Sequence, residues 1–423
     1  MRSPGIRCYA SSVGAAIGFL AGCNSFAQTQ SDAQPPIIAQ RIAANTSSYQ
    51  VLYRFGVHDN PHRDRGGANP GGLLEAAGTF YGTTYGGGHF DEGTAYSFSS
   101  AGVKTTLHRF GIGNGGIFPV GPLIEMNGLL YGATTLGGAC GSGSVYSMST
   151  TGTVTILHSF CYPEGIQPAS GPIDADGTLY GTTEALGGSG SGWGTVYSLT
   201  TTGNEKVLHT FTGPPDGAEP VAPLLNVNGT LYGTTVYGGT GCHSGGCGTV
   251  FSISTTGKEK VLYSFQGGSD GALPLSGLID VNGTFYGTTL RGGGNHLGCQ
   301  PSYAGCGTVF SITTSGSERV VYRFNGTNGT SPNAGLLEMN GSLYGTASSG
   351  GSSGWGVVFS LSASGGESVL HNFADGNDGA NPTADLIEVN GVLYGTTWQG
   401  GSNGCNRLGC GTIFAISPSA KTR

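Results

Sequence analysis

The chain has 423 residues, of which 82 are glycine and only 10% are Asp, Glu, Lys or Arg. The glycines follow no Gly-X-Y period, which excludes a collagen-like triple helix. The net charge of −7 and the scattering of the 17 basic residues argue against nucleic acid as a partner, because phosphate binding needs clustered Lys and Arg.

The first residues have the pattern of a targeting segment. Arg2 and Arg7 are basic, and the apolar stretch over 10–22 is too short and too rich in glycine to be a good membrane span. This pattern predicts an exported protein that contacts a membrane only if it carries a lipid anchor.

Two cleavage sites compete in this segment. The Leu-Ala-Gly-Cys motif at 20–23 matches a lipobox, which predicts a signal peptide over 1–22 and an outer-membrane lipoprotein lipidated at Cys23. The Ser-Phe-Ala motif at 25–27 fits ordinary cleavage, with a signal peptide over 1–27 and a secreted or periplasmic protein. Residues 23–47 are polar with Ala, Pro and Gln, which predicts a flexible linker.

A tandem repeat fills the rest of the chain. The tetrapeptide Tyr-Gly-Thr-Thr, or a close variant, begins at Tyr81, Tyr131, Tyr180, Tyr232, Tyr286, Tyr344 and Tyr394. Glycine-centred turns recur roughly every 8–12 residues, and no long window has a 3.6-residue period, so the repeat is not helical.

Each copy predicts four strands, called a to d in chain order. Strand a ends at an acid or Asn, and an Asn-Gly turn leads to strand b, which carries the tetrapeptide; both central residues of such a turn need positive φ. Strand c is typified by residues 248–254 and strand d by residues 207–211. The glycine of the tetrapeptide is costly within a strand, which predicts the close approach of a neighbouring sheet or a bulky side chain.

The two ends of the repeat array complement each other. A lone strand d at 51–55 precedes the first tetrapeptide, and the chain ends after a strand c at 411–417. We therefore predict an all-β fold, a seven-bladed β-propeller of four-stranded blades over 48–418, in which 51–55 completes the last blade and 419–423 is a tail. Closure removes open sheet edges, whereas a solenoid, the alternative, would need caps.

These motifs resemble a known family. The order Leu-Tyr-Gly-Thr-Thr, Gly-Gly, Gly-Thr-Val-Phe-Ser, Val-Leu-His-x-Phe and Asp-Gly-Ala-x-Pro is similar to the GloVer tandem repeat of bacterial exported proteins, over about residues 49–417. The resemblance implies an extracytoplasmic repeat protein. It brings no established activity and no catalytic residues.

The loops predict which face of the propeller binds. The a–b and c–d turns, on one face, are short and uniform, whereas the b–c and d–a loops, on the other, are long and variable. Binding residues are commonly found on long loops held by a rigid scaffold. We therefore expect a ligand on the b–c/d–a face.

Apart from Cys8 and Cys23 the chain has eight cysteines, an even number that favours disulfides in an exported chain. Their spacing predicts the local pairs Cys140–Cys161, Cys242–Cys247, Cys299–Cys306 and Cys405–Cys410. Zinc is the alternative, but it needs motifs that converge, and these pairs lie on different blades.

Columns shared by several blades favour structural roles. Before strand c, the position of Cys247, Cys306 and Cys410 holds Trp193 and Trp355 in other blades, which predicts loop packing, with sugar stacking as the alternative. The strand d column of His108, His158, His209 and His371 predicts packing or hydrogen bonds between strands. The d–a loop acids Asp216, Asp270 and Asp378 predict turn capping, with calcium as the alternative.

Charged loops of the first blade depart from the repeat. The first d–a loop contains His58, Asp59, His62 and Asp64, and the first b–c loop contains His89, Asp91 and Glu92. Two or more His with carboxylates on one face can bind a metal ion or supply acid–base groups. A solvated loop is the favoured interpretation, and no other cofactor is predicted.

Two classes of function remain. The favoured one is a monomeric binding or scaffold module for a glycan, a peptide or a partner protein. The alternative is a carbohydrate-active hydrolase or lyase with its site at the channel mouth; no linear catalytic motif supports it. Converging His and carboxylates at the mouth would favour the enzyme, and an aromatic face would favour binding.

Overall fold

The computed structural model describes residues 49–56, 65–111, 116–187, 192–242, 245–294, 299, 305–362, 365–401, 405 and 408–418. All of these residues belong to the unit Pro36–Arg423. They form strands and turns, and among them no helix is long and apolar enough to cross a bilayer.

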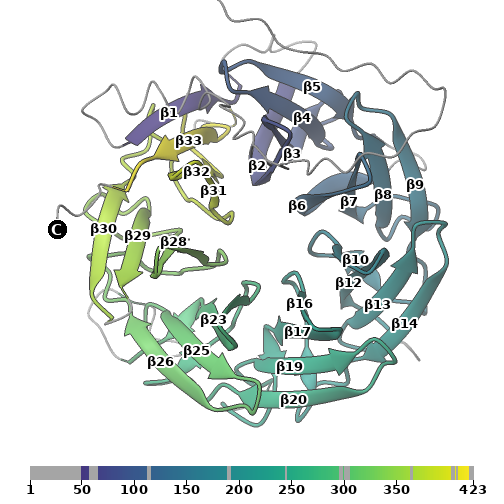
Figure 1. The fold of residues 1–423 in the computed structure, drawn as a ribbon, viewed down its shortest axis with the longest axis vertical. Helices are drawn as coiled ribbons and strands as arrows, with labels where there is room; N and C mark the ends of the chain where they lie inside the picture. The colour runs from purple at the N-terminus through teal and green to yellow at the C-terminus, as the bar shows by residue number, and fades with distance from the viewer. Residues whose placement is uncertain are drawn as a thin grey trace, which may run out of the picture. The chain divides into compact units, whose positions relative to one another are not determined.

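Seven antiparallel sheets stand in a ring around a central channel, as predicted (Figure 1). Six of them have four strands, and the sheet of blade 3 has five because its inner strand is split in two. Blade 1 has β2 (Arg65–Ala76), β3 (Thr79–Gly88), β4 (Thr94–Ser99) and β5 (Lys104–Arg109), and blade 2 has β6 (Ile117–Met126), β7 (Leu129–Leu136), β8 (Ser144–Ser149) and β9 (Val154–Ser159). Blade 3 has β10 (Ile166–Pro168), β11 (Ile173–Ala175), β12 (Thr178–Ala185), β13 (Thr195–Thr200) and β14 (Glu205–Thr210). Blade 4 has β16 (Leu225–Val227), β17 (Thr230–Thr235), β19 (Thr249–Ser254) and β20 (Glu259–Ser264).

The remaining blades follow the same order, with strand a at the channel and strand d outermost (Figure 1). Blade 5 has β22 (Ile279–Val281), β23 (Thr284–Thr289), β25 (Thr308–Thr313) and β26 (Glu318–Arg323), and blade 6 has β27 (Leu337–Met339), β28 (Ser342–Ala347), β29 (Val357–Ser362) and β30 (Glu367–Asn372). Blade 7 has β31 (Ile387–Val389), β32 (Val392–Thr397), β33 (Thr412–Ile416) and β1 (Tyr49–Arg54).

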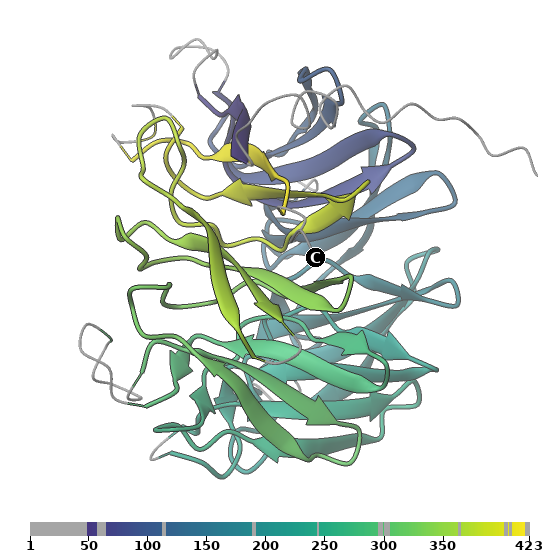
Figure 2. The ribbon, with the colours of Figure 1, turned by 60° about the vertical axis from the view of Figure 1, so that its left-hand side comes forward.

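The first strand of the chain closes the ring. β1 pairs antiparallel with β33, with Tyr49 opposite Ile416 and Arg54 opposite Thr412, and Figure 2 shows the two strands side by side. The prediction that the lone strand d completes the last blade is confirmed. No blade of the ring therefore lacks its outer strand.

The acid or Asn that ends strand a holds the turn that follows it. Glu125 accepts a 2.6 Å hydrogen bond from the N–H of Gly128, while Asn127 and Gly128 have φ of 54° and 79°. Asn226 makes the equivalent bond to Gly229 at 3.1 Å. The type I′ turn is thus fixed both by Asn-Gly and by a side-chain acceptor three residues before the glycine.

The glycine of the tetrapeptide makes room for an aromatic ring of strand c. Gly132 lies opposite Tyr146, and a Cβ on Gly132 would come within 2.5 Å of the Tyr146 hydroxyl. Gly345 has the same relation to Phe359, at 2.7 Å from the ring. The bulky neighbour predicted from sequence is therefore the cross-strand partner in the same sheet.

The last threonine of the tetrapeptide pairs with the first residue of strand c. Thr235 and Thr249 share a hydroxyl hydrogen bond of 2.7 Å, and similar pairs occur in five other blades. In blade 6 both partners are apolar, because Ala347 stands opposite Val357. Replacing both members of a buried polar pair avoids leaving one of them without a partner.

Regularity of the inner strand decreases around the ring. β2 and β6 run continuously for 12 and 10 residues, and in blade 3 the same path is split into β10 and β11. In blades 4 and 5 the first part forms separate two-stranded sheets, in which β15 (Gly217–Ala218) pairs β18 (Tyr237–Gly238) and β21 (Gly271–Ala272) pairs β24 (Arg291–Gly292). The loops of the b–c/d–a face are thus tied to the sheets beneath them.

Candidate functional site

The disulfides lie on the predicted binding face. The described cysteines form the four expected pairs, Cys140–Cys161, Cys242–Cys247, Cys299–Cys306 and Cys405–Cys410. Cys140–Cys161 joins the b–c and d–a loops of blade 2, so these loops do share one face.

The two Trp residues in the cysteine column differ in their surroundings. Trp355 packs against the buried cluster of blades 6 and 7, in agreement with a packing role. Trp193 lies against Gly213 but keeps 49% of its surface exposed.

Seven residues with positive φ occupy the same d–a loop position in each blade, just before the residues that line the channel. Their φ values lie between 53° and 60°, although none is glycine, and we call them the mouth ring: Asn69, Phe118, Gln167, Glu219, Leu273, Ser331 and Asn381. Each backbone N–H donates to the carbonyl of the residue two before strand c of the preceding blade, as in Phe118 to Glu92 at 2.8 Å. Because these inter-blade bonds hold the backbone, the side chain at each position is free to differ.

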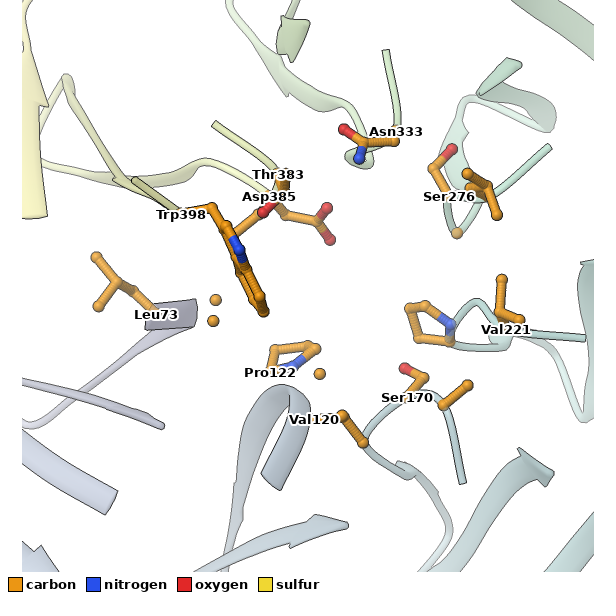
Figure 3. Close-up of a pocket in the computed structure, with 18 of the residues that line it drawn as sticks. Leu73, Val120, Pro122, Ser170, Val221, Ser276, Asn333, Thr383, Asp385 and Trp398 are labelled. Atoms are coloured by element: carbon orange, nitrogen blue, oxygen red, sulfur yellow. The ribbon is translucent and has the colours of Figure 1, made fainter. Parts of the chain in front are cut away.

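The channel is a cavity of about 500 Å³ at the centre of the ring (Figure 3). Its wall is largely apolar on blades 1 to 5, where Leu73, Val120 and Val221 line it. Asn333 and Asp385 lie on the opposite wall, on blades 6 and 7. Among the described lining residues Asp385 is the only carboxylate, so they do not supply the pair of carboxylates that glycoside hydrolysis commonly uses.

Asp385 departs from the repeat. The other blades have glycine or proline at this position, as at Gly335 and Pro223. The N–H of Gly335 donates to the Asp385 carboxylate at 2.5 Å, and burial raises the pKa of this group although that hydrogen bond lowers it. Asp385 thus places an acceptor in the channel wall and links blade 7 to blade 6.

Three aromatic side chains meet at the mouth of the channel, where blades 7, 1 and 2 adjoin. The rings of Tyr85 and Phe118 are stacked with centroids 4.7 Å apart, and the rings of Tyr85 and Trp398 are 5.7 Å apart. We call these three residues the aromatic cluster. Asn69 holds one end of it, because its side-chain amide donates to the Trp398 carbonyl at 2.8 Å.

A second hollow, of about 480 Å³, lies on the other side of Tyr85. Asn69 and Tyr85 line both this hollow and the channel. Of eight exposed large hydrophobic side chains among the described residues, Tyr85, Phe90 and Leu408 all line this one hollow. Such gathering of exposed apolar surface is typical of a binding site.

The structure describes only three of the first-blade residues that were predicted to bind a metal, His89, Asp91 and Glu92. Asp91 accepts the Gly87 N–H at 2.7 Å, the His89 ring packs edge-on against Phe90, and Glu92 is buried. Where the chain is described, these three residues do not form a set of three ligand atoms within 4.8 Å. His58, Asp59, His62 and Asp64 lie outside the described residues, so this metal site stays a prediction.

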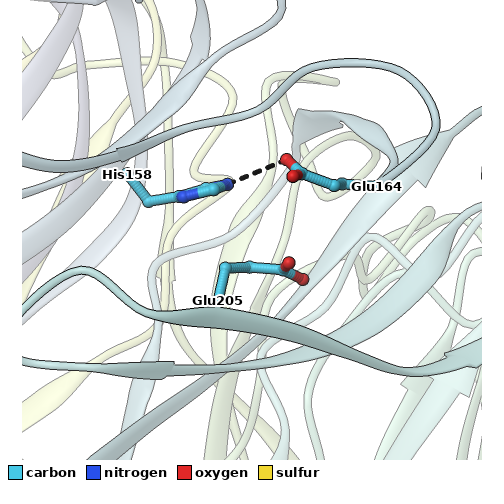
Figure 4. A group of neighbouring side chains, drawn as sticks. All are labelled: His158, Glu164 and Glu205. Atoms are coloured by element: carbon cyan, nitrogen blue, oxygen red, sulfur yellow. Dashed lines mark hydrogen bonds and ion pairs between the residues drawn. The ribbon is translucent and has the colours of Figure 1, made fainter.

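The structure brings together His and carboxylates elsewhere, between neighbouring blades. His158 of strand d is 3.0 Å from Glu164 of the following d–a loop, and Glu205 reaches in from the next blade (Figure 4). His209, Asp216 and Glu259 form the next such group, and in each group the three ligand atoms lie within 4.8 Å. The distances would suit a divalent cation.

The acid groups of these clusters have shifted pKa values. Burial, reinforced by the neighbouring Glu164 carboxylate, raises the pKa of Glu205 to about 7. Burial and the neighbouring Asp216 carboxylate raise the pKa of Glu259, also to about 7. Burial opposes ionisation of Asp216 as well, but hydrogen bonds from His209, Gly217 and Thr212 outweigh it and lower the pKa of that group.

The three positions that form these clusters hold other residue types at other junctions between blades. The Tyr263 hydroxyl donates to Asp270 at 2.9 Å, next to Glu318, and His371 contacts Asp378 at 3.1 Å, next to Tyr49. Tyr49 stacks on His371 with ring centroids 3.5 Å apart. This variation indicates a repeated link between blades, and the packing and hydrogen-bonding role expected for the His column is confirmed.

The whole repeat pattern matches a known family. The Gloeobacter/Verrucomicrobia repeat matches residues 12–193, 153–300 and 299–423. The chain belongs to this family. The resemblance inferred from the tetrapeptide and its flanking motifs is thereby confirmed, and membership of an exported repeat family together with four disulfides makes this Gloeobacter/Verrucomicrobia repeat protein extracytoplasmic.

Solved structures similar to this repeat protein share little sequence with it. A putative 6-phosphogluconolactonase from Bacteroides uniformis is 12% identical over 72% of this chain and 84% of its own, with a TM-score of 0.46. The aldose sugar dehydrogenase from Streptomyces coelicolor is 14% identical over 87% and 97%, with a TM-score of 0.42. A puromycin hydrolase is 10% identical, with a TM-score of 0.49; the match covers 81% of this chain but only 53% of the hydrolase. No curated protein matches the chain.

Sequence reasoning did not single out the residues that form the aromatic cluster. Trp398 and Tyr85 share one repeat position, which holds Thr135, Glu184 or Val236 in other blades. Phe118 belongs to the mouth ring, in which Asn occurs in two blades and each of the other five blades has a residue type of its own. The sequence did contain a signal, because Tyr85 and Trp398 depart from the residue types that other blades have just after the tetrapeptide. This departure becomes visible only when the seven repeats are aligned.

Proposed function

We propose that this protein is a glycan-binding propeller whose ligand lies on the aromatic cluster at the channel mouth. One observation supports this above the others: Tyr85, Phe118 and Trp398 occupy positions that vary between blades, yet they gather at one place between two hollows. A repeat needs none of these rings to fold, since the other blades lack them.

The chemistry of the site suits a sugar chain. Aromatic rings offer a rigid apolar face to the C–H groups of a pyranose, and the amides of Asn69 and Gln399 lie beside them to exchange hydrogen bonds. The two hollows together, about 500 and 480 Å³, are large enough for more than one sugar unit. We further propose that Cys23 carries a lipid, which would hold the propeller at the membrane of the cell envelope.

Binding to a panel of soluble polysaccharides, measured by affinity electrophoresis and calorimetry, tests the proposal. Trp398→Ala and Tyr85→Ala are each expected to weaken binding about tenfold, or about 1.4 kcal/mol, because each removes one face of the ligand's contact. Trp193→Ala, which removes a half-exposed ring on another blade, is the matched control and should leave binding unchanged.

Three results would contradict the proposal. The protein could bind none of the polysaccharides, it could bind them equally well after Trp398→Ala, or Trp193→Ala could reduce binding as much. Selective binding of peptides at the same aromatic residues would replace the glycan by a peptide as the ligand.

A further inference from the structure

Arg291, on the b–c/d–a face of blade 5, is a cation with no carboxylate partner among the described residues. Arg291 belongs to β24 and lines a hollow of about 190 Å³ between the Cys299–Cys306 disulfide and the loops of blade 6. The equivalent residue in other blades is uncharged, as with Tyr237 and Gln399. The arginine is therefore not required by the repeat.

The hydrogen bonds of Arg291 leave one edge of its guanidinium open. Its Nη1 donates to the Ser331 hydroxyl at 2.6 Å and to the Leu290 carbonyl at 3.4 Å. No described residue accepts from Nε or Nη2, which carry three of the five N–H donors. This edge presents the parallel N–H pair that binds a carboxylate or another oxyanion in bidentate fashion.

The charge around Arg291 is uncompensated. None of the described residues that line the hollow is Asp or Glu. Burial lowers the pKa of the guanidinium, and no carboxylate among the described residues counters this. Burial of a charge is costly unless the charge is paired, so this partly buried arginine favours an anion from outside the chain.

The hollow also supplies neutral donors. Thr330, Ser331 and Ser349 line it with hydroxyl groups, and the Thr330 and Ser331 hydroxyls are 3.5 Å apart. A volume of about 190 Å³ is below that of pockets that enclose whole ligands, roughly 300–1,000 Å³, but suits one anionic group. The walls are fixed by the disulfide and by the Ser348 hydroxyl, which donates to the Ser331 carbonyl at 3.0 Å.

We propose that Arg291, with the hydroxyls of Thr330, Ser331 and Ser349, is a binding site for a single oxyanion group, a sulfate or carboxylate carried by an acidic ligand. The site lies on blades 5 and 6, apart from the aromatic cluster on blades 7, 1 and 2. It goes beyond glycan binding at that cluster and does not depend on it.

The test compares sulfate and glucuronate, as sodium salts, with sodium chloride at equal ionic strength, on the purified protein. Calorimetry should show saturable binding of at least one of the two anions to the wild-type protein. Arg291→Gln should abolish it, and Arg291→Lys should weaken it at least fivefold, because an ammonium group cannot make the bidentate contact. Arg319→Gln removes an exposed arginine of β26 and should change nothing.

Each outcome decides the proposal. Binding of sulfate alone would assign a sulfated ligand, and binding of glucuronate would assign a carboxylate. Equal binding by wild type and Arg291→Gln, equal loss in Arg319→Gln, or no saturable binding of either anion to wild type would overturn it. If Arg291→Gln does not fold, the comparison of wild type with Arg291→Lys decides in the same way.

Discussion

The role of a single position in the repeat can be inferred by comparing the seven blades, because the position occurs once in each. The aromatic residue that faces the tetrapeptide glycine is Tyr in blades 1 to 3 and Phe in blades 4 to 7. The hydroxyls of Tyr146 and Tyr197 are buried and have no hydrogen-bond partner among the described residues. Such a hydroxyl loses its water on folding without gaining a bond.

We therefore expect Tyr146→Phe and Tyr197→Phe to stabilise the protein by about 1 kcal/mol each. The reverse change, Phe359→Tyr in blade 6, is the matched control and should destabilise it by a similar amount. Urea unfolding measures all three free energies of unfolding. Destabilisation by either Tyr→Phe change would show that the hydroxyl has a partner.

Residues that repeat were predictable from sequence, and residues that do not were harder to place. The blades could be predicted from three features: the seven tetrapeptides, the Asn-Gly turns and the complementary chain ends. Each of these features can be recognised from residues close together in the sequence. The tetrapeptide glycine and threonine have their partners on strand c. The spacing of the motifs along the chain predicts only part of this cross-strand geometry. Trp398 and Arg291 act through neighbours on other blades, which no local pattern reveals.

At the scale of strands and loops, the junctions between blades carry the titratable groups. Burial and a neighbouring carboxylate raise the pKa of Glu205, Glu259 and Glu318 from 4.5 to about 7. A raised folded-state pKa means that the folded protein prefers the neutral acid. The stability contributed by these groups is therefore fully present below about pH 4.5 and is lost as the pH rises through about 7.

The triple variant Glu205→Gln/Glu259→Gln/Glu318→Gln keeps a neutral group at each junction at every pH. Above pH 7 it should be more stable than wild type by about 1 kcal/mol per site, a figure reduced because the carboxyl groups are only half-buried. Chemical unfolding at pH 5 and pH 8 measures the difference. Parallel pH profiles for the two proteins would contradict the assignment, and a wild type stabilised by added divalent cation would show that a cation replaces the proton.

At the scale of the whole molecule, the residues that build the ring differ from the residues that we propose to bind a ligand. The seven-bladed ring was predicted because the tetrapeptide and the turns repeat in every blade and β1 completes the last one. The mouth ring holds seven backbones in one conformation and leaves their side chains free to vary. Binding specificity can therefore change at the mouth without loss of the scaffold.

The most direct measurement uses the emission of Trp398. The chain has three tryptophans, so the variant Trp193→Phe/Trp355→Phe leaves Trp398 as the only one. On titration with a polysaccharide that the protein binds, we predict a saturable change in Trp398 fluorescence and protection from iodide quenching, with the affinity found by calorimetry. Calorimetric binding with no change in this emission or its quenching would contradict the assignment of the ligand site to the channel mouth.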